Sequence, residues 1–225
     1  SVANIKLRRF ELSELLGFLH CACNPGTAPL ARLHPPRSMM LDTYLHDTAL
    51  TVGRDRLRFE APHGERYVAA ASLKEYPERS RPGMLDALLS IDGEITVSMA
   101  FRFLAQEKAE KLIRSRQRYF VITQKTLLQH IKDALLKTDS EPDEGKAAMA
   151  QDASQALGAI TSHGARYGYY NMTVLAIGDT GRAADETLRM ATGAINQAGY
   201  LAIRERMGLL SAYAGTLPGQ WGEIV

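Results

Sequence analysis

The sequence contains little cysteine and no long apolar run. Only two of its 225 residues are cysteines, Cys21 and Cys23, and a single residue separates them. A disulfide between residues this close is strained, and a zinc site needs about four ligands, whereas only His20 and His34 lie near the thiols. We therefore expect reduced thiols on a helix, as in a cytoplasmic protein. No stretch of about 18 apolar residues occurs, so the sequence predicts no membrane-spanning helix.

Motifs for phosphate binding and catalysis are also missing from the sequence. There is no G-x-x-x-x-G-K-[ST] phosphate loop, and the one Gly-Lys pair, at 145–146, lies in a polar stretch. No G-x-S-x-G, H-E-x-x-H or G-x-G-x-x-G pattern occurs, and the six histidines are scattered. Asp179 follows an apolar strand, but without a phosphate loop it is better explained by the start of the next helix. We expect a chain that is not itself an enzyme and that holds no metal or cofactor.

The charge balance gives no case for nucleic-acid binding. Lys and Arg number 27 and Asp and Glu 25, a formal net charge of +2, which is far below the basic excess of a typical DNA- or RNA-binding domain. At 45% hydrophobic and 23% charged residues, the composition is that of an ordinary globular protein. A chain of this length buries enough surface to form a core of its own.

Hydrophobic periodicity divides the chain into helices and strands. Leu12, Leu15, Leu16 and Leu19 predict a helix over 11–22, which ends at Asn24-Pro25-Gly26. In the segment 94–104, apolar residues alternate with polar ones and predict a strand with one buried face formed by Ile95, Val97, Met99, Phe101 and Phe103. The remaining expected elements are a short helix at 39–47, a hairpin around Gly53, strands at 65–77, 167–179 and 200–208, and helices at 82–92 (opened by Pro82, with Leu89 on its buried face), at 181–198 and after 208.

The order of these elements predicts an α+β fold. Outside the segment 105–163, the order from residue 67 onward is strand-helix-strand repeated twice. That order predicts a ferredoxin-like four-stranded antiparallel sheet with two packed helices. Residues 105–163 lack strand signals and are expected to form a long helical-hairpin insertion with a polar break at 138–146. We thus expect an N-terminal helix and hairpin extension over 1–62 and the ferredoxin-like domain over 63–225.

A basic segment at the start of the insertion is a candidate interface. Between residues 102 and 118 the chain carries six basic side chains against two glutamates. One explanation is a solvated helix face with ion pairs between neighbouring turns. The other is docking to an acidic partner or to an anionic membrane surface, with Lys111, Arg114 and Arg118 facing outward. Nucleic acid is a poorer third explanation because aromatic stacking partners are sparse there.

Much of the chain resembles a known family. The segments ARYGYYNMTVLAIGDT, AADETLRMATGAINQAGY and AYAGTLPGQ, together with RPGMLDALLS and ITVSMAFRFLAQEKAEKLIRSRQRYF, resemble the region before the motor of the TrbE/CagE/VirB-type conjugation ATPases. The resemblance covers about residues 65–225 well and the first 60 loosely, and the order of the segments carries it. It implies that LPGQWGEIV leads toward a RecA-like motor domain beyond this chain.

The resemblance also implies a function. The parent protein would be a bacterial ATPase on the cytoplasmic side of the inner membrane that powers type IV secretion or conjugal transfer of DNA or protein. It would form homo-oligomers and contact a small inner-membrane subunit and companion ATPases. ATP and Mg²⁺ would bind the absent motor domain, since no Walker residues occur in this chain. The chain itself would then be a non-catalytic docking and assembly domain. The alternative is a stand-alone small-molecule-binding or enzyme domain, because ferredoxin-like folds have many functions.

Overall fold

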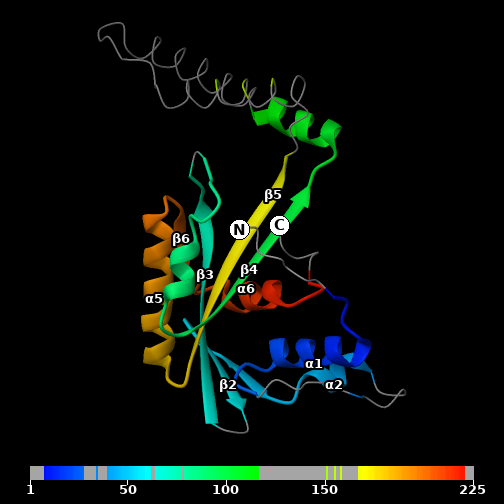
Figure 1. Cartoon of the computed structure of the whole chain (residues 1–225), viewed down its shortest axis with the longest axis vertical. Helices are drawn as coiled ribbons and strands as arrows, with labels where there is room; N and C mark the ends of the chain where they lie inside the picture. The colour runs from blue at the N-terminus through cyan, green and yellow to red at the C-terminus, as the bar shows by residue number, and fades with distance from the viewer. Residues whose placement is uncertain are drawn as a thin grey trace, which may run out of the picture. The chain divides into compact units, whose positions relative to one another are not determined.

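The chain divides into two compact units. The computed structural model describes residues 8–27, 34, 40–61, 64–77, 79–116, 151, 155, 158 and 167–220. One unit consists of Ser1–Ala100 with Asn171–Val225, and the other of Phe101–Tyr170. Most of the sheet and its covering helices belong to the first unit (Figure 1). The elements in chain order are α1 (Leu12–Cys23), α2 (Leu41–Leu45), β1 (Ala49–Val52), β2 (Leu57–Ala61), β3 (Gly64–Glu75), the 3₁₀-helix η1 (Asp86–Ser90), β4 (Glu94–Phe103), β5 (Gly168–Gly178), α5 (Gly181–Gln197), β6 (Leu201–Arg204) and α6 (Leu209–Thr216).

The strands form one sheet of six. Their order is β1-β2-β3-β5-β4, and β6 also pairs with β3. The pairs β1–β2, β2–β3, β3–β5 and β3–β6 are antiparallel. The predicted α+β class and antiparallel sheet are therefore confirmed, as is the prediction that the strands near 95–104 and 168–177 share one sheet. The predicted count of four strands is wrong, because the β1–β2 hairpin extends the sheet through the pairing of β2 with β3.

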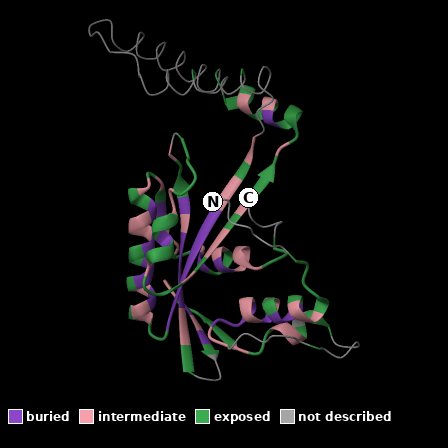
Figure 2. Cartoon of the chain, viewed as in Figure 1, coloured by how far each residue is buried: buried purple, intermediate pink, exposed green. Residues whose placement is uncertain are grey.

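Both faces of β3 are covered, which explains its run of buried residues. Successive side chains of a strand point to opposite faces. Ala69 and Ala71 lie in the cluster that α5 covers, whereas Val68 and Ala70 lie in the cluster that α6 covers. In Figure 2 buried positions also follow β5, whose last seven residues, from Met172 onward, are buried. The core is thus a layer on each side of the central strands.

The start of α5 lies very close to the sheet. Thr180 caps this helix, and its hydroxyl accepts a hydrogen bond from the Ala183 N–H at 3.1 Å. A Cβ added at Gly178 would lie 2.7 Å from the Ala184 nitrogen, so only glycine fits at this strand end. The predicted helix over 181–198 is confirmed, and its buried residues, Ala184, Thr187, Leu188, Ala191 and Ile195, form one stripe.

Two local predictions are wrong. The segment 82–92 is not an α-helix opened by Pro82, because a turn with Gly83 at φ +84° precedes the short η1. Leu88 is buried there, but Leu89, which we expected beside it, is 88% exposed. On β4 the expected buried face is exposed at Met99, Phe101 and Phe103. Alternation places these side chains on one face, whereas burial also requires an element over that face.

The predicted helical insertion is described at its start and at three isolated positions. Residues 106–116 are helical, and so are the isolated positions 151, 155 and 158. Arg118 and the predicted polar break at 138–146 lie outside the described residues. Among the residues that the structure describes, no helix is long and apolar enough to cross a membrane.

Candidate functional site

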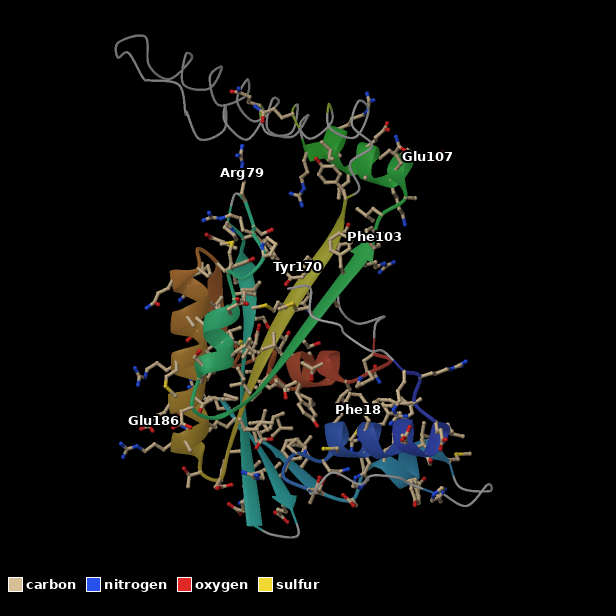
Figure 3. All side chains as sticks on the ribbon, viewed as in Figure 1. Phe18, Arg79, Phe103, Glu107, Tyr170 and Glu186 are labelled. Carbon is tan, nitrogen blue, oxygen red and sulfur yellow. The ribbon has the colours of Figure 1, made fainter. Side chains whose placement is uncertain are left out.

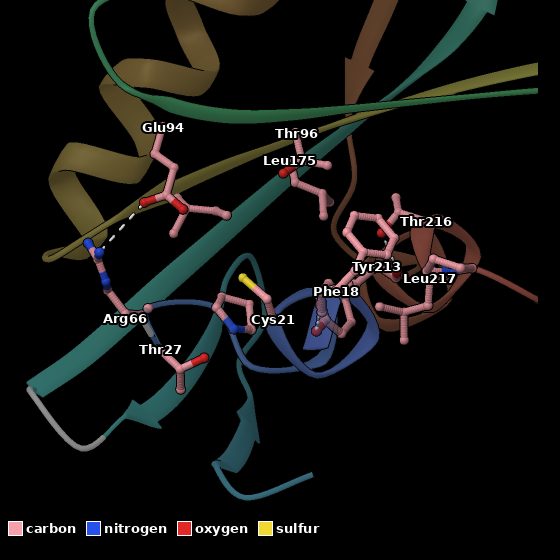
Figure 4. A pocket seen from close by; sticks show the side chains of 15 residues that line it. Phe18, Cys21, Thr27, Arg66, Glu94, Thr96, Leu175, Tyr213, Thr216 and Leu217 are labelled. Carbon is pink, nitrogen blue, oxygen red and sulfur yellow. Dashed lines mark hydrogen bonds and ion pairs between the residues drawn. The ribbon is translucent and has the colours of Figure 1, made fainter. Parts of the chain in front are cut away.

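An open cavity of about 710 Å³ lies in the first unit between α1, α6 and the sheet. Its floor is formed by Leu175 and Ile177 of β5, and one wall by Phe18 and Cys21 of α1. Figure 4 shows Arg66 and Glu94 at one end, with Phe18, Tyr213 and Leu217 at the other and Cys21 between them. Most of the lining is apolar. The other lining residues are Ala22, Pro25, Gly26, Thr27, Thr96, Thr216 and Pro218.

A buried asparagine holds the end of α1 in place. Asn24 is fully buried, and its amide donates hydrogen bonds to the carbonyls of His20, at 2.8 Å, and Leu45, at 2.6 Å. Its side-chain oxygen accepts from the Asp47 N–H at 3.1 Å, and from the N–H and hydroxyl of Thr48 at 3.2 and 2.8 Å. Four of these five hydrogen bonds join the end of α1 to the end of α2 and to the segment between α2 and β1, and the fifth, to His20, lies within the end of α1. The first wall of the cavity is fixed by this network.

The second wall is tied to the first by Tyr213 of α6. Its hydroxyl contacts the carbonyls of Ala22 and Cys23, each at 3.2 Å. Burial raises the pKa of the Tyr213 hydroxyl, and the nearby Cys23 adds to the shift, so the group stays protonated and able to donate. Its ring packs on Phe59 of β2, with 5.4 Å between the centroids. The sheet, α6 and α1 are therefore joined through one side chain.

The polar end of the cavity is lined by one arginine and one glutamate, Arg66 and Glu94. Arg66 of β3 pairs with Asp179 and, at 3.6 Å, with Glu94, so two carboxylates share one guanidinium. The stem of Arg66 lies against Gly26, where a Cβ would collide with it. Gly26 has φ +90°, a conformation that glycine adopts at no steric cost. The turn after α1 thus supports the arginine at the cavity end.

The basic segment predicted from the sequence is exposed where the structure describes it. Lys111 and Arg114 both lie on the helix over 106–116 and are exposed. Glu107, labelled in Figure 3, lies on the same helix. Arg114 is 52% exposed and reaches Glu110, one turn earlier, at 3.8 Å. Exposed pairs of this kind contribute little to stability. Arg118, the third predicted interface residue, lies outside the described residues.

A second charged cluster holds the β1–β2 hairpin to α5. Asp185 of α5 accepts two hydrogen bonds from Arg56, at 3.1 and 2.7 Å, and one from Arg204 of β6 at 2.6 Å. Burial by itself raises the pKa of the Asp185 carboxyl, but the hydrogen bonds from Arg56 and Arg204 outweigh it and hold that pKa below its ordinary value. Sequence reasoning missed this cluster because Arg56 and Asp185 are 129 residues apart.

The neighbourhood of the two cysteines includes one buried histidine. His20 is buried, and its Nε2 lies 2.8 Å from a carboxylate oxygen of Asp47. Cys23 is a buried free thiol whose pKa is raised by burial, while Cys21 is half-buried. Within the described residues of the chain, no group of three or more His, Cys, Asp or Glu side chains could hold a metal ion.

Comparison with known proteins gives consistent matches. Residues 3–144 match the model of the CagE, TrbE, VirB family, a component of the type IV transporter system. The type IV secretion system protein PtlC of Bordetella pertussis is 24% identical over 181 residues, which is 80% of this chain and 20% of PtlC. The protein virB4 of Agrobacterium tumefaciens is 26% identical over 189 residues, 83% of this chain and 21% of the relative.

A third relative is named as a conjugal transfer protein. A probable conjugal transfer protein TrbE of Sinorhizobium fredii is 28% identical over 158 residues, 69% of this chain and 23% of its own length. The chain spans about a fifth of the length of the first relatives it matches.

Proposed function

Because the chain belongs to the CagE, TrbE, VirB family, a component of the type IV transporter system, we propose that it is a non-catalytic docking and assembly domain of a secretion ATPase. The parent protein energises pilus assembly and the transfer of DNA or protein. ATP and Mg²⁺ belong to a RecA-like motor domain outside these 225 residues. The names of two relatives support a role in secretion or conjugation, because one relative is named as a type IV secretion system protein and the other as a probable conjugal transfer protein.

The domain occupies the cytoplasmic side of the inner membrane and binds other components of the machine. These components include a small inner-membrane subunit, companion ATPases and further copies of the parent protein. In this proposal the strands β6, β3, β5 and β4, with η1 and α5, form a ferredoxin-like core. Their order in the sheet supports that description.

The observation that carries the docking role is the exposed basic face of the helix over 106–116. Its charged side chains are Lys108, Lys111, Arg114 and Arg116 against Glu107 and Glu110, and all but Glu110 are exposed. Charges at the rim of an interface mainly steer association. We propose Lys111, Arg114 and Arg118 as residues of the docking surface, of which the structure describes the first two.

Charge reversal at this helix tests the docking role. The double substitution Lys111→Glu with Arg114→Glu should lower binding to vesicles containing anionic phosphatidylglycerol, and capture of secretion components from a membrane extract, by about tenfold at low salt. The difference should shrink at high salt because exposed charges are screened. Arg189→Glu with Arg206→Glu makes the same change of charge at exposed positions elsewhere and should have little effect. Undiminished binding in both assays would mean that the helix face is merely solvated.

The absence of a phosphate loop from the sequence predicts that the chain does not bind nucleotide. Titration calorimetry with ATP and Mg²⁺ at near-physiological concentration should give no saturable heat. Micromolar affinity would contradict the non-catalytic assignment.

The cavity favours one alternative, a domain that binds a small molecule. Its volume of about 710 Å³ falls within the range of about 300–1,000 Å³ that is usual for ligand pockets. A thermal-shift screen of metabolites would favour this alternative if a compound stabilised the chain but not the variant Ala22→Phe, which fills the cavity. If no compound did so, the docking proposal would stand alone.

A further inference from the structure

The cavity between α1 and α6 combines an apolar body with a charged end. Phe18 is 51% exposed at its mouth, although a phenylalanine of this size is usually buried. Tyr213 and Leu217 line the same end, while Leu175 and Ile177 form the floor. Large aromatic side chains beside a pocket are typical of the anchor positions of protein interfaces.

The walls are held apart by polar contacts. The hydrogen bonds of Asn24 fix the end of α1, and the Tyr213 hydroxyl reaches two carbonyls of that helix. A cavity with fixed walls loses little entropy when it is filled, so it binds more tightly than one that must first form. The site is therefore preorganised for an occupant.

The charged end indicates what the occupant carries. Arg66 and Glu94 line this end, and Asp179, which lies outside the lining, also pairs with Arg66, so the three side chains together carry one net negative charge. A carboxylate or phosphate at this end would meet the carboxylate of Glu94 and this net negative charge. A lysine or arginine would meet them favourably, because complementary charges fix register and suppress wrong partners. Fatty acids and anionic lipids are disfavoured for the same reason.

We propose that this cavity binds a short peptide segment of a protein partner. One or two large apolar side chains of the peptide fill the space beside Phe18 and Tyr213, and a neighbouring lysine or arginine reaches Glu94. The cavity is then a second contact site, separate from the basic helix. The inference rests on the proposed docking function, because the occupant is part of a protein partner.

The thiol of Cys21 reports on the occupancy of the cavity. The chain has only two cysteines, and Cys23→Ala leaves Cys21 as the sole thiol. In that variant iodoacetamide should label Cys21 of the free chain. Peptides that bind the chain would then be isolated from a displayed library of random ten-residue peptides. The selected peptides should share an apolar pair next to a lysine or arginine, and the synthetic peptides should slow labelling about tenfold at saturation.

Substitutions in the cavity should separate its two ends. Phe18→Ala should weaken binding of a selected peptide about tenfold or more, as for an aromatic anchor. Glu94→Gln should weaken binding of the same peptide about tenfold, but should not affect binding of a version with methionine in place of its basic residue. Leu89→Ala removes an exposed apolar side chain that does not line the cavity, and should leave binding unchanged. The variant Ala22→Phe, which fills the cavity, should not bind the selected peptides. If Ala22→Phe does not fold, Thr216→Phe is a second variant with a filled cavity.

Several results would overturn the proposal. One is that the chain with a filled cavity, Ala22→Phe or Thr216→Phe, selects the same peptides as the native chain. Another is that iodoacetamide does not label Cys21 of the free chain. The last two are that sodium dodecanoate protects Cys21 whereas peptides do not, and that Cys21 is protected by dimerisation of the chain.

The basic-helix variant, Lys111→Glu with Arg114→Glu, should keep peptide binding. The Ala22→Phe variant should keep vesicle binding. Failure of one site is thereby distinguished from failure of the other.

Discussion

Removal of the Asn24 side chain is expected to destabilise the first unit strongly. The substitution Asn24→Ala deletes five hydrogen bonds at a fully buried position. At a net contribution of about 1 kcal/mol each, their loss sets a ceiling of about 5 kcal/mol. Asp47 is exposed and Thr48 half-buried, so water can replace some of their bonds in the variant. We therefore expect the free energy of unfolding to fall by about 3 kcal/mol.

Urea denaturation followed by circular dichroism measures this loss. Since a domain is stable by only about 5–15 kcal/mol, a change of about 3 kcal/mol shifts the midpoint clearly, by about 1 M urea for a slope near 3 kcal/mol/M. Asn196→Ala is the matched control, because Asn196 is exposed and its side-chain oxygen accepts a hydrogen bond from the Ala202 N–H at 2.9 Å. That variant should lose about 1 kcal/mol or less. If Asn24→Ala is no less stable than Asn196→Ala, the network does not hold α1.

Two further changes test the packing around α5. Asp185→Asn should lower the free energy of unfolding by about 2 kcal/mol near neutral pH, because charge-assisted bonds to Arg56 and Arg204 are lost. The folded-state pKa of Asp185 is depressed, so its contribution is present above the unfolded-state pKa and is lost as pH falls through the folded value. Acid titration of stability should thus be steeper for the native chain than for Asp185→Asn, and equal slopes would contradict the ion-pair assignment. Gly178→Ala should destabilise by about 1–3 kcal/mol, because the new Cβ would lie 2.7 Å from the Ala184 nitrogen, and an unchanged melting temperature would contradict this close contact.

The cavity and the basic helix represent two different kinds of surface. The helix over 106–116 presents its basic charges to solvent, where they affect the rate of association and its salt dependence. The cavity offers apolar area inside fixed walls, where burial of a partner side chain contributes affinity. A docking domain that uses both would bind quickly through charge and be retained through apolar contact.

The local sequence pattern is sufficient to predict those helices and strands whose hydrophobic periodicity is clear. The strand over 168–178 and the helix over 181–197 agree with their predicted bounds to within a residue or two, because an apolar run, a cap and a glycine stop all lie within the segment itself. The exposure of Lys111 and Arg114 follows from local pattern in the same way. The family is also recognisable from the order of such segments, and the comparisons confirm it.

The tertiary structure alone decided which faces are covered and which distant residues meet. Strand alternation puts Met99 on the same face as Ile95, but cannot indicate that Met99 is 55% exposed, because burial depends on another element. The hairpin at 49–61 is expected as an extension, yet it joins the main sheet through pairing with β3. The sequence identifies Asn24 only as a helix stop, whereas its hydrogen-bond partners extend to Thr48. The cavity brings together side chains from residue 18 to residue 218, and no local pattern encodes their meeting, since it depends on how α1 and α6 pack against one sheet face.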